Sequence, residues 1–150
     1  MKRTLRPAQS MAMLSPAAVT VLIADDDPDA REVLGEVLEL MLPGVRTVFA
    51  VDGLDAVAVA VDVCPWAVIL DLGMPRLDGL DAAQRLQQRM GKNLPILIAA
   101  SGDYKRLREG YSVFDYSLRK PIQIHRLAHY LARAMVFTDG SDGQGRTTPD

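Results

Sequence analysis

Short apolar runs rich in β-branched residues alternate along this chain with segments of helical periodicity. Val19–Ala24 is one such run and stops at three aspartates. The segment after it, Pro28–Met41, places apolar residues three and four positions apart. Short runs that are apolar throughout are typical of strands buried on both faces. Because the alternation repeats, the chain is expected to form strands and helices in turn.

Five strands and five helices are expected in this alternation. The expected strands are Val19–Ala24, Arg46–Ala50, Ala67–Leu70, Ile96–Ala100 and Asp115–Arg119. The expected helices are Pro28–Met41, Gly53–Val61, about Asp78–Met90, Tyr104–Gly110 and Ile122–Phe137. The fourth helix should be short or irregular, because the positions between Ser101 and Lys120 must also hold a loop, a turn and a strand. The alternation implies parallel pairing through right-handed crossovers, hence a doubly wound α/β fold.

Composition favours one ordinary domain. The chain has 150 residues, of which 49% are hydrophobic and 24% charged, with a formal net charge of -2. A chain of this size buries a core without disulfides or metals. The near-neutral charge argues against nucleic acid or a membrane as a partner. Cys64 is the single cysteine, which excludes an internal disulfide and favours a reducing, cytoplasmic setting.

The two ends of the chain differ in composition from the middle. Residues 1–18 are expected to form an N-terminal extension, and residues 138–150, rich in Gly, Ser, Thr and Asp, a flexible tail. The folded domain is therefore expected over residues 19–137. We expect no effector domain after it, so the chain would be a complete single-domain protein or a domain cut from a longer one.

Polar residues stand where four of the expected strands end. They are Asp25, Asp26 and Asp27 after the first strand, Asp71 after the third, Ser101 after the fourth, and Lys120 with Pro121 after the fifth. Parallel strands deliver their carboxyl ends to one edge of the sheet, where open α/β proteins bind their ligands. Residues far apart in the sequence are therefore expected to form one site.

The chemistry of this set follows from its charges. Clustered carboxylates call for a hard cation, and magnesium prefers one or two carboxylates with waters and phosphate oxygens. Asp71 could act as a nucleophile and take a phosphoryl group, with Lys120 as a cation and Ser101 as a hydroxyl donor. Each residue alone has a plainer explanation as a helix cap or turn residue. Four such features at four strand ends favour a functional site.

In these residues the chain resembles the receiver domain of bacterial two-component response regulators. The resemblance covers about Val19 to Phe137, and all four stretches occur in order. The matching stretches are Val21–Pro28 (VLIADDDP), Ile69–Pro75 (ILDLGMP) with Asp78 and Gly79, Ser101 with Gly102, and Leu118–Pro121 (LRKP). The resemblance implies a flavodoxin-like fold with strand order 2-1-3-4-5.

The resemblance also assigns roles to the acidic residues. Asp71 matches the phosphoacceptor, which takes a phosphoryl group from a histidine of a sensor kinase. Asp25 and Asp26 match the acidic pair that holds Mg²⁺ together with the acceptor, and the backbone carbonyl of Gly73 would be a further ligand.

Two more positions match residues that contact the phosphoryl group. Lys120 matches the lysine that contacts it, and in the family the bond from this lysine to the following proline is usually cis. Ser101 matches the hydroxyl residue that moves toward it on activation. The distance from Pro95 is one residue longer than usual, so Ala100 is the alternative for this position.

The fifth strand departs from the family pattern. The aromatic residue usually found three positions before the lysine is replaced by Ser117, and Tyr116 is expected on the opposite face of the strand. His125 and His129 lie four apart on the last helix, and a surface or interface position is favoured for them over a metal site.

Two classes of function remain from the sequence. The first is a phosphorylation switch that signals by docking to another protein, and the second is a pseudo-receiver that binds partners without phosphorylation. A phosphatase with an aspartate nucleophile is a weaker third, since Gly73 stands where its second acid is needed. We expect a phosphoacceptor that catalyses its own phosphoryl transfer and dephosphorylation, not a conventional enzyme. The expected partners are a sensor histidine kinase or a histidine phosphotransfer protein and a downstream protein, and a phosphorylation-dependent dimer stays open.

Overall fold

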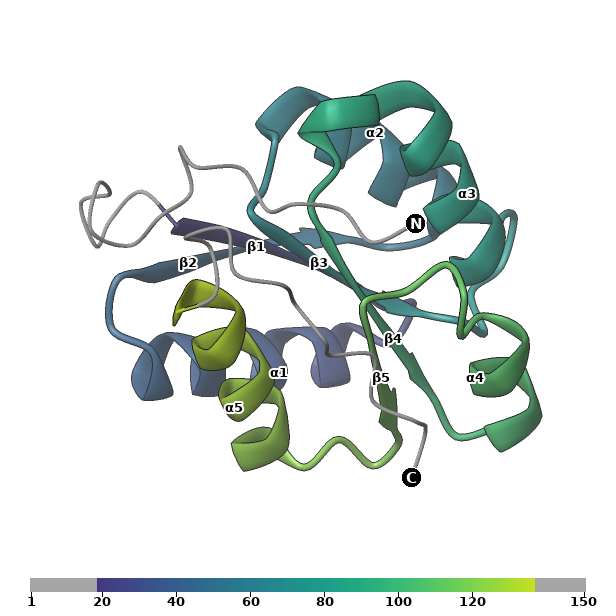
Figure 1. Cartoon of the computed structure of the whole chain (residues 1–150). Helices are drawn as coiled ribbons and strands as arrows, with labels where there is room; N and C mark the ends of the chain where they lie inside the picture. The colour runs from purple at the N-terminus through teal and green to yellow at the C-terminus, as the bar shows by residue number, and fades with distance from the viewer. Residues whose placement is uncertain (1–18, 137–150) are drawn as a thin grey trace.

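The protein was analysed as a computed structural model, which describes residues 19–136. Five parallel strands form one sheet in the order β2-β1-β3-β4-β5 (Figure 1). The strands are β1 (Val19–Ala24), β2 (Val45–Ala50), β3 (Ala67–Asp71), β4 (Ile96–Ser101) and β5 (Tyr116–Arg119). The helices are α1 (Pro28–Met41), α2 (Gly53–Val63), α3 (Gly79–Met90), α4 (Tyr104–Glu109) and α5 (Ile124–Val136), with a 3-10 turn at Gly91–Asn93. The expected doubly wound α/β fold and its strand order are confirmed.

Helices cover both faces of the sheet, and the core is therefore divided into two layers (Figure 1). One layer joins the sheet to α2, α3 and α4, and the other joins it to α1 and α5. Alternation within β4 shows the division, because Leu97 and Ala99 belong to the first layer and Ile98 and Ala100 to the second. Successive side chains of a strand point to opposite faces, so each strand supplies both layers.

Aspartates begin four of the helices. Asp27, Asp52, Asp78 and Asp103 are the N-caps of α1, α2, α3 and α4, and each side chain accepts a hydrogen bond from a backbone N–H of the first turn. A carboxylate at this position satisfies an otherwise unpaired donor and suits the helix dipole. The third aspartate of the acidic triplet, Asp27, thus has the plainer of the two roles that the sequence allowed.

Most expected boundaries agree with the structure to within two residues, and the differences have local reasons. The fifth strand begins at Tyr116, since Asp115 instead accepts a hydrogen bond from the backbone N–H of Leu97 through its side chain, at 2.8 Å. The carbonyl of Gln123 accepts from the N–H groups of Arg126 and Leu127, so α5 begins at Ile124. The fourth helix has six residues, as the short connection predicted.

The predicted domain limits are only partly covered by the structure. The expected extension 1–18, the tail 138–150 and the last residue of the expected domain, Phe137, lie outside the described residues. In the part that is described, none of the helices has the length and apolar character needed to cross a membrane.

Candidate functional site

The polar residues predicted to meet do lie at one edge of the sheet. Asp71 is the last residue of β3 and Ser101 the last of β4, while Asp25 follows β1 and Lys120 follows β5. Parallel pairing sets Ala24 beside Leu70 and Asp71 beside Ala100, so these strands end at the same level. The fold therefore brings together residues from four separate parts of the sequence.

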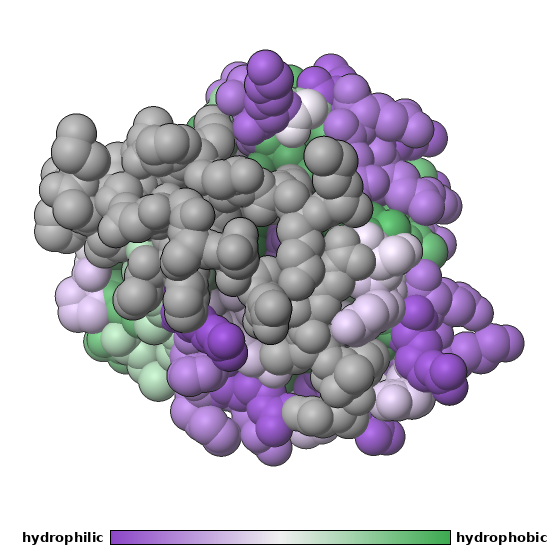
Figure 2. Space-filling model, in the orientation of Figure 1, coloured by the Kyte–Doolittle hydropathy of each residue, from purple (hydrophilic) through white to green (hydrophobic). Residues whose placement is uncertain are grey.

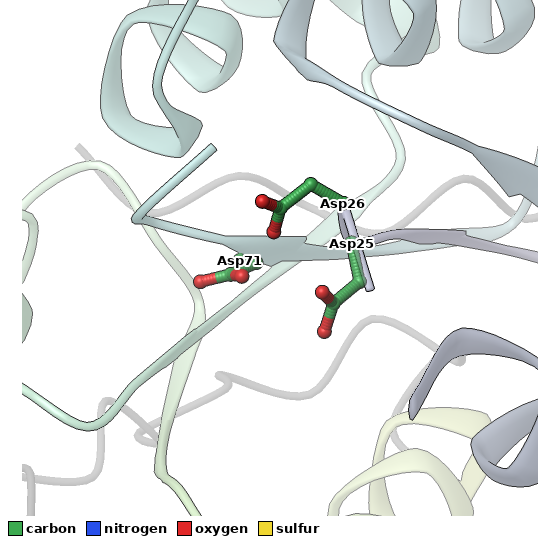
Figure 3. A group of neighbouring side chains, drawn as sticks. All are labelled: Asp25, Asp26 and Asp71. Atoms are coloured by element: carbon green, nitrogen blue, oxygen red, sulfur yellow. The ribbon is translucent and has the colours of Figure 1, made fainter. Parts of the chain in front are cut away.

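Three carboxylates form the centre of this edge. Asp25, Asp26 and Asp71 each offer an oxygen, and these oxygens lie within 4.8 Å of one another (Figure 3). Asp25 and Asp71 are only 8% and 9% exposed, whereas Asp26 is exposed. Hard cations such as Mg²⁺ prefer this donor set, completed by waters and phosphate oxygens on the open side. The residues present therefore fit a magnesium ion.

Lys120 joins two of the carboxylates. Its Nζ lies 2.9 Å from Asp25 Oδ2 and 3.1 Å from Asp71 Oδ2. Burial by itself lowers the pKa of Lys120, but hydrogen bonds to Asp25 and Asp71 and their negative charges outweigh it and hold the pKa above its ordinary value. The ammonium is charged at neutral pH. One cation among three carboxylates leaves an excess of negative charge, which a divalent cation would neutralise.

The backbone around Asp71 is held closely. Its Oδ1 accepts a hydrogen bond from the N–H of Gly73 at 3.0 Å, and the N–H of Leu72 donates to the carbonyl of Ala100. A Cβ on Gly79 would lie 2.4 Å from the carbonyl oxygen of Asp71, so glycine is the residue that fits there. These contacts fix the direction of the Asp71 side chain.

Gly73 follows Asp71 by two residues and is exposed. A Cβ at this position would lie 3.7 Å from Asp71 Oδ1 and 3.9 Å from Arg106 Nη1, which is ordinary contact distance. Packing therefore does not require glycine here. Its carbonyl stays a predicted metal ligand.

Ala100 and Ser101 are neighbours in β4, so they point to opposite faces of the sheet. Ala100 is paired with Asp71, and its methyl group is buried in the layer under α1 and α5. Ser101 is 5% exposed, and its Oγ accepts a hydrogen bond from the N–H of Asp103 at 3.0 Å. A serine hydroxyl that accepts one bond can still donate its proton. Ser101 is thus the hydroxyl available at this edge, and its contact with a phosphoryl group stays a prediction.

Three arginines near this edge were not singled out from the sequence. Arg31 of α1 donates to the carbonyl of Asp25 at 2.8 Å, and Arg106 of α4 donates to the carbonyl of Leu72 at 3.2 Å. Arg76 forms an ion pair with Asp52 at 2.6 Å. No spacing rule identifies such contacts, because in each one an arginine of a helix or loop meets a group outside its own element.

The remaining aromatic and histidine predictions can also be compared with the structure. Tyr116 faces α5 and stacks on Tyr130 with ring centroids 4.9 Å apart, while Ser117 is buried on the other face, as predicted. The peptide bond between Lys120 and Pro121 is cis, as in the family. His125 and His129 are both exposed, in agreement with the surface position favoured for them.

Comparisons with known proteins agree with this geometry. A family profile described as "Response regulator receiver domain" matches residues 21–132. Response regulator MprA of Mycobacterium sp. (strain KMS) is 39% identical over 134 residues, which cover 88% of this chain and 53% of the relative. The DNA-binding dual master transcriptional regulator RpaA of Synechocystis sp. (strain ATCC 27184 / PCC 6803 / Kazusa) is 32% identical over 125 residues, covering 81% of this chain and 50% of the relative. The chain thus spans about half the length of these curated relatives.

Solved structures show the same architecture. The receiver domain of the Francisella response regulator 1452 matches 81% of this chain and 99% of its own length, with a TM-score of 0.71 and 27% identity. A CheY-like receiver domain from Methylobacillus flagellatus matches 77% of this chain and 97% of its own, with a TM-score of 0.70 and 29% identity. Sequence profile, relatives and architecture agree, and the chain belongs to the response regulator receiver domain family.

Proposed function

We propose that this chain is a phosphorylation-activated receiver whose acceptor is Asp71 and whose cofactor is Mg²⁺. The observation that carries the proposal is Lys120, whose Nζ contacts both Asp25 and Asp71 beside a third carboxylate, Asp26. A cation already in place at the acceptor suits a reaction that brings further negative charge to the same point.

The proposed reaction is a phosphoryl transfer from a phosphorylated histidine of a sensor kinase or a histidine phosphotransfer protein. A carboxylate oxygen of Asp71 forms a bond to phosphorus as the phosphorus–nitrogen bond of the donor breaks, and the electron pair of that bond stays on the imidazole. The product is an acyl phosphate on Asp71. Catalysis of this kind depends on positioning and on stabilising charge on the phosphoryl oxygens.

The residues of this edge divide the work. Asp25, Asp26, Asp71 and the carbonyl of Gly73 would hold Mg²⁺, which supplies positive charge to the phosphoryl oxygens when bound. Lys120 would contact the phosphoryl group through its ammonium, since Nζ already lies 2.9 Å from Asp25 and 3.1 Å from the acceptor Asp71. Ser101 would donate its hydroxyl proton to a phosphoryl oxygen while still accepting from Asp103. The chain would also catalyse loss of its own phosphoryl group and is not a conventional enzyme.

Signalling would follow from a shift between two conformations. A phosphoryl group adds charge and acceptor oxygens, and the conformation that contacts it best is populated more. We propose docking to a downstream protein as the output, in the cytoplasm where a single free cysteine is stable. DNA binding, which the name of the Synechocystis relative states, belongs to a protein of which this chain spans half and is not part of the proposal.

Intact-mass measurement tests the acceptor. The protein is incubated with acetyl phosphate and Mg²⁺, with and without EDTA, and Asp71→Asn is compared with Asp62→Asn, an exposed acid on α2. We expect one phosphoryl group on the wild type and on Asp62→Asn, and none on Asp71→Asn or in EDTA. An unlabelled wild type beside a labelled control receiver would contradict the switch and favour the pseudo-receiver. Label surviving on Asp71→Asn would show a different acceptor.

A further inference from the structure

Arg106 reaches from α4 toward the acceptor. Its Nη1 donates to the carbonyl of Leu72 at 3.2 Å, and its Nε lies 3.8 Å from Oδ2 of Asp103, the N-cap of α4. The side chain therefore joins α4 to the loop that follows β3. That loop begins directly after Asp71.

The space between Arg106 and Asp71 is open. The position that a Cβ of Gly73 would occupy lies 3.9 Å from Arg106 Nη1 and 3.7 Å from Asp71 Oδ1. Apart from Gly73 and its chain neighbours, no third atom of the described residues lies within 4 Å of that position. Arg106 Nη1 and Asp71 Oδ1 thus border the same small space, which a side chain at position 73 would enter.

The two oxygens of Asp71 therefore have different surroundings. Oδ2 is 3.1 Å from Lys120, which is delivered by β5, while Oδ1 faces the space that Arg106 borders from α4. A phosphoryl group on Asp71 carries its negative charge outward on three oxygens. Cations on two sides stabilise such a group better than one.

We propose that Arg106 is a second cationic contact of the phosphoryl group on Asp71, and this inference rests on the proposed function. The guanidinium has five N–H donors, of which the Leu72 carbonyl uses one, so it can hold the loop and a phosphoryl oxygen together. Its side chain is 51% exposed, so packing does not hold the guanidinium in one position. The pair with Asp103 at 3.8 Å is weak enough to be exchanged for a phosphoryl oxygen.

This contact would connect phosphorylation to α4 without an aromatic switch. The position of the usual aromatic holds Ser117, which is buried, and Tyr116 packs on the opposite layer. Ser101 and Arg106 lie on either side of the start of α4, so a phosphoryl group bound by both would tie this helix to Asp71. The surface over α4 is largely hydrophilic, which suits a region that responds to charge (Figure 2).

The test compares Arg106→Gln and Arg106→Lys with Arg108→Gln, which removes the same charge from an exposed position of the same helix. The rate of labelling by acetyl phosphate with Mg²⁺ is followed by intact mass, and thermal unfolding is followed without donor. We expect labelling of Arg106→Gln to be slower by about threefold to tenfold, less than for the loss of a principal charge-stabilising donor, because Lys120 stays in place. Arg106→Lys should recover part of the rate, and Arg108→Gln should match the wild type.

Hydrogen exchange separates a contact with the phosphoryl group from a purely structural role of Arg106, because only the contact would change the protection of α4 on labelling. Amides of α4 should gain protection on labelling in the wild type and in Arg108→Gln, and not in Arg106→Gln. Equal labelling and equal protection in Arg106→Gln and Arg108→Gln would overturn the inference and leave the proposed function intact. If Arg106→Gln unfolds, Arg106→Lys decides, because a folded lysine variant without recovered labelling also overturns it. An unlabelled wild type would instead refute the proposed function itself.

Discussion

The two ends of the sheet are built from opposite chemistry. At the carboxyl ends of the strands, Asp25, Asp71 and Ser101 are buried polar residues. At the amino ends, Trp66 and Ile96 are buried apolar residues, 4% and 1% exposed. The backbone ladder is continuous through both ends, since the N–H of Ile96 donates to the carbonyl of Trp66 just as that of Leu72 donates to Ala100.

The difference indicates where stability and function lie. Burial of carboxylates near one another costs free energy, and Lys120 offsets only part of it. Burial of large apolar side chains at the other end provides the stability that this site lacks. The amino end has one imperfection of its own, because the Nε1–H of Trp66 has no hydrogen-bond partner among the described residues. Mutations at the two ends should therefore separate stability from phosphoryl transfer.

The largest effect on stability is expected at the amino end. Trp66→Ala leaves a cavity among Ala67, Leu131 and their neighbours in the layer under α1 and α5, and should cost about 3–5 kcal/mol of unfolding free energy. Urea unfolding measures the loss, and labelling of the protein that remains folded should be unchanged. Trp66→Phe is the matched control, since it also removes the unpaired N–H and should cost far less. A labelling defect in folded Trp66→Ala would break the division between the two ends.

Substitution of Lys120 should slow labelling, whereas substitution of Trp66 should lower stability. Lys120→Gln keeps a hydrogen-bond donor near Asp25 and Asp71 but removes the cation, so labelling by acetyl phosphate should fall by about 30-fold to 200-fold, or about 2–3 kcal/mol in the barrier. The control is Lys105→Gln, an exposed lysine on α4. Labelling of Lys120→Gln within twofold of the control would remove Lys120 from the proposed chemistry.

The fold was predictable because its signals are local and repeated. Val19–Ala24, apart from Thr20, and Ile96–Ala100 are apolar, which is typical of strands buried on both faces. Parallel pairing then places Asp25, Asp71 and Lys120 together. The first helix was less well specified. Its apolar period includes Val33, which is 59% exposed, while Leu34 is buried.

The contacts of the arginines were not predictable from spacing. Arg106 and Leu72 are 34 positions apart, and their hydrogen bond depends on the length of α4 and on the path of the loop after β3. Arg76 meets Asp52 from a loop in which its own backbone adopts a positive φ of 64°, a conformation that no spacing in the sequence indicates. A sequence shows which side chains carry charge, but the partner of each is set by tertiary geometry.

Magnesium should stabilise the protein by binding at the carboxyl end of the sheet. Mg²⁺ at ten times its dissociation constant should add about 1.4 kcal/mol to the unfolding free energy of the wild type, because it binds the folded state alone. Asp26→Asn should bind more weakly and gain less at the same concentration, and Asp29→Asn, an exposed acid in the first turn of α1, is the control. Melting curves with Mg²⁺ or with matched Na⁺ measure the difference, and equal gains in all three proteins would indicate nonspecific binding.

The smallest effect is expected at Asp52, which lies at the carboxyl end but has a structural role. The hydrogen bond from the N–H of Asp55 lowers the pKa of Asp52; burial opposes this, and Arg76 lowers the pKa further. A lowered folded-state pKa means that its stabilisation is present above the unfolded value near 3.8 and is lost as pH falls through the folded value. Asp52→Asn should therefore lose about 1 kcal/mol at pH 7 and show a flatter decline of unfolding free energy as the pH falls below about 4. Urea titrations of Asp52→Asn and of the control Asp62→Asn measure this difference. Asp71→Asn removes repulsion between carboxylates and should cost no stability, so the two acids at this edge should differ in their effect on the unfolding free energy.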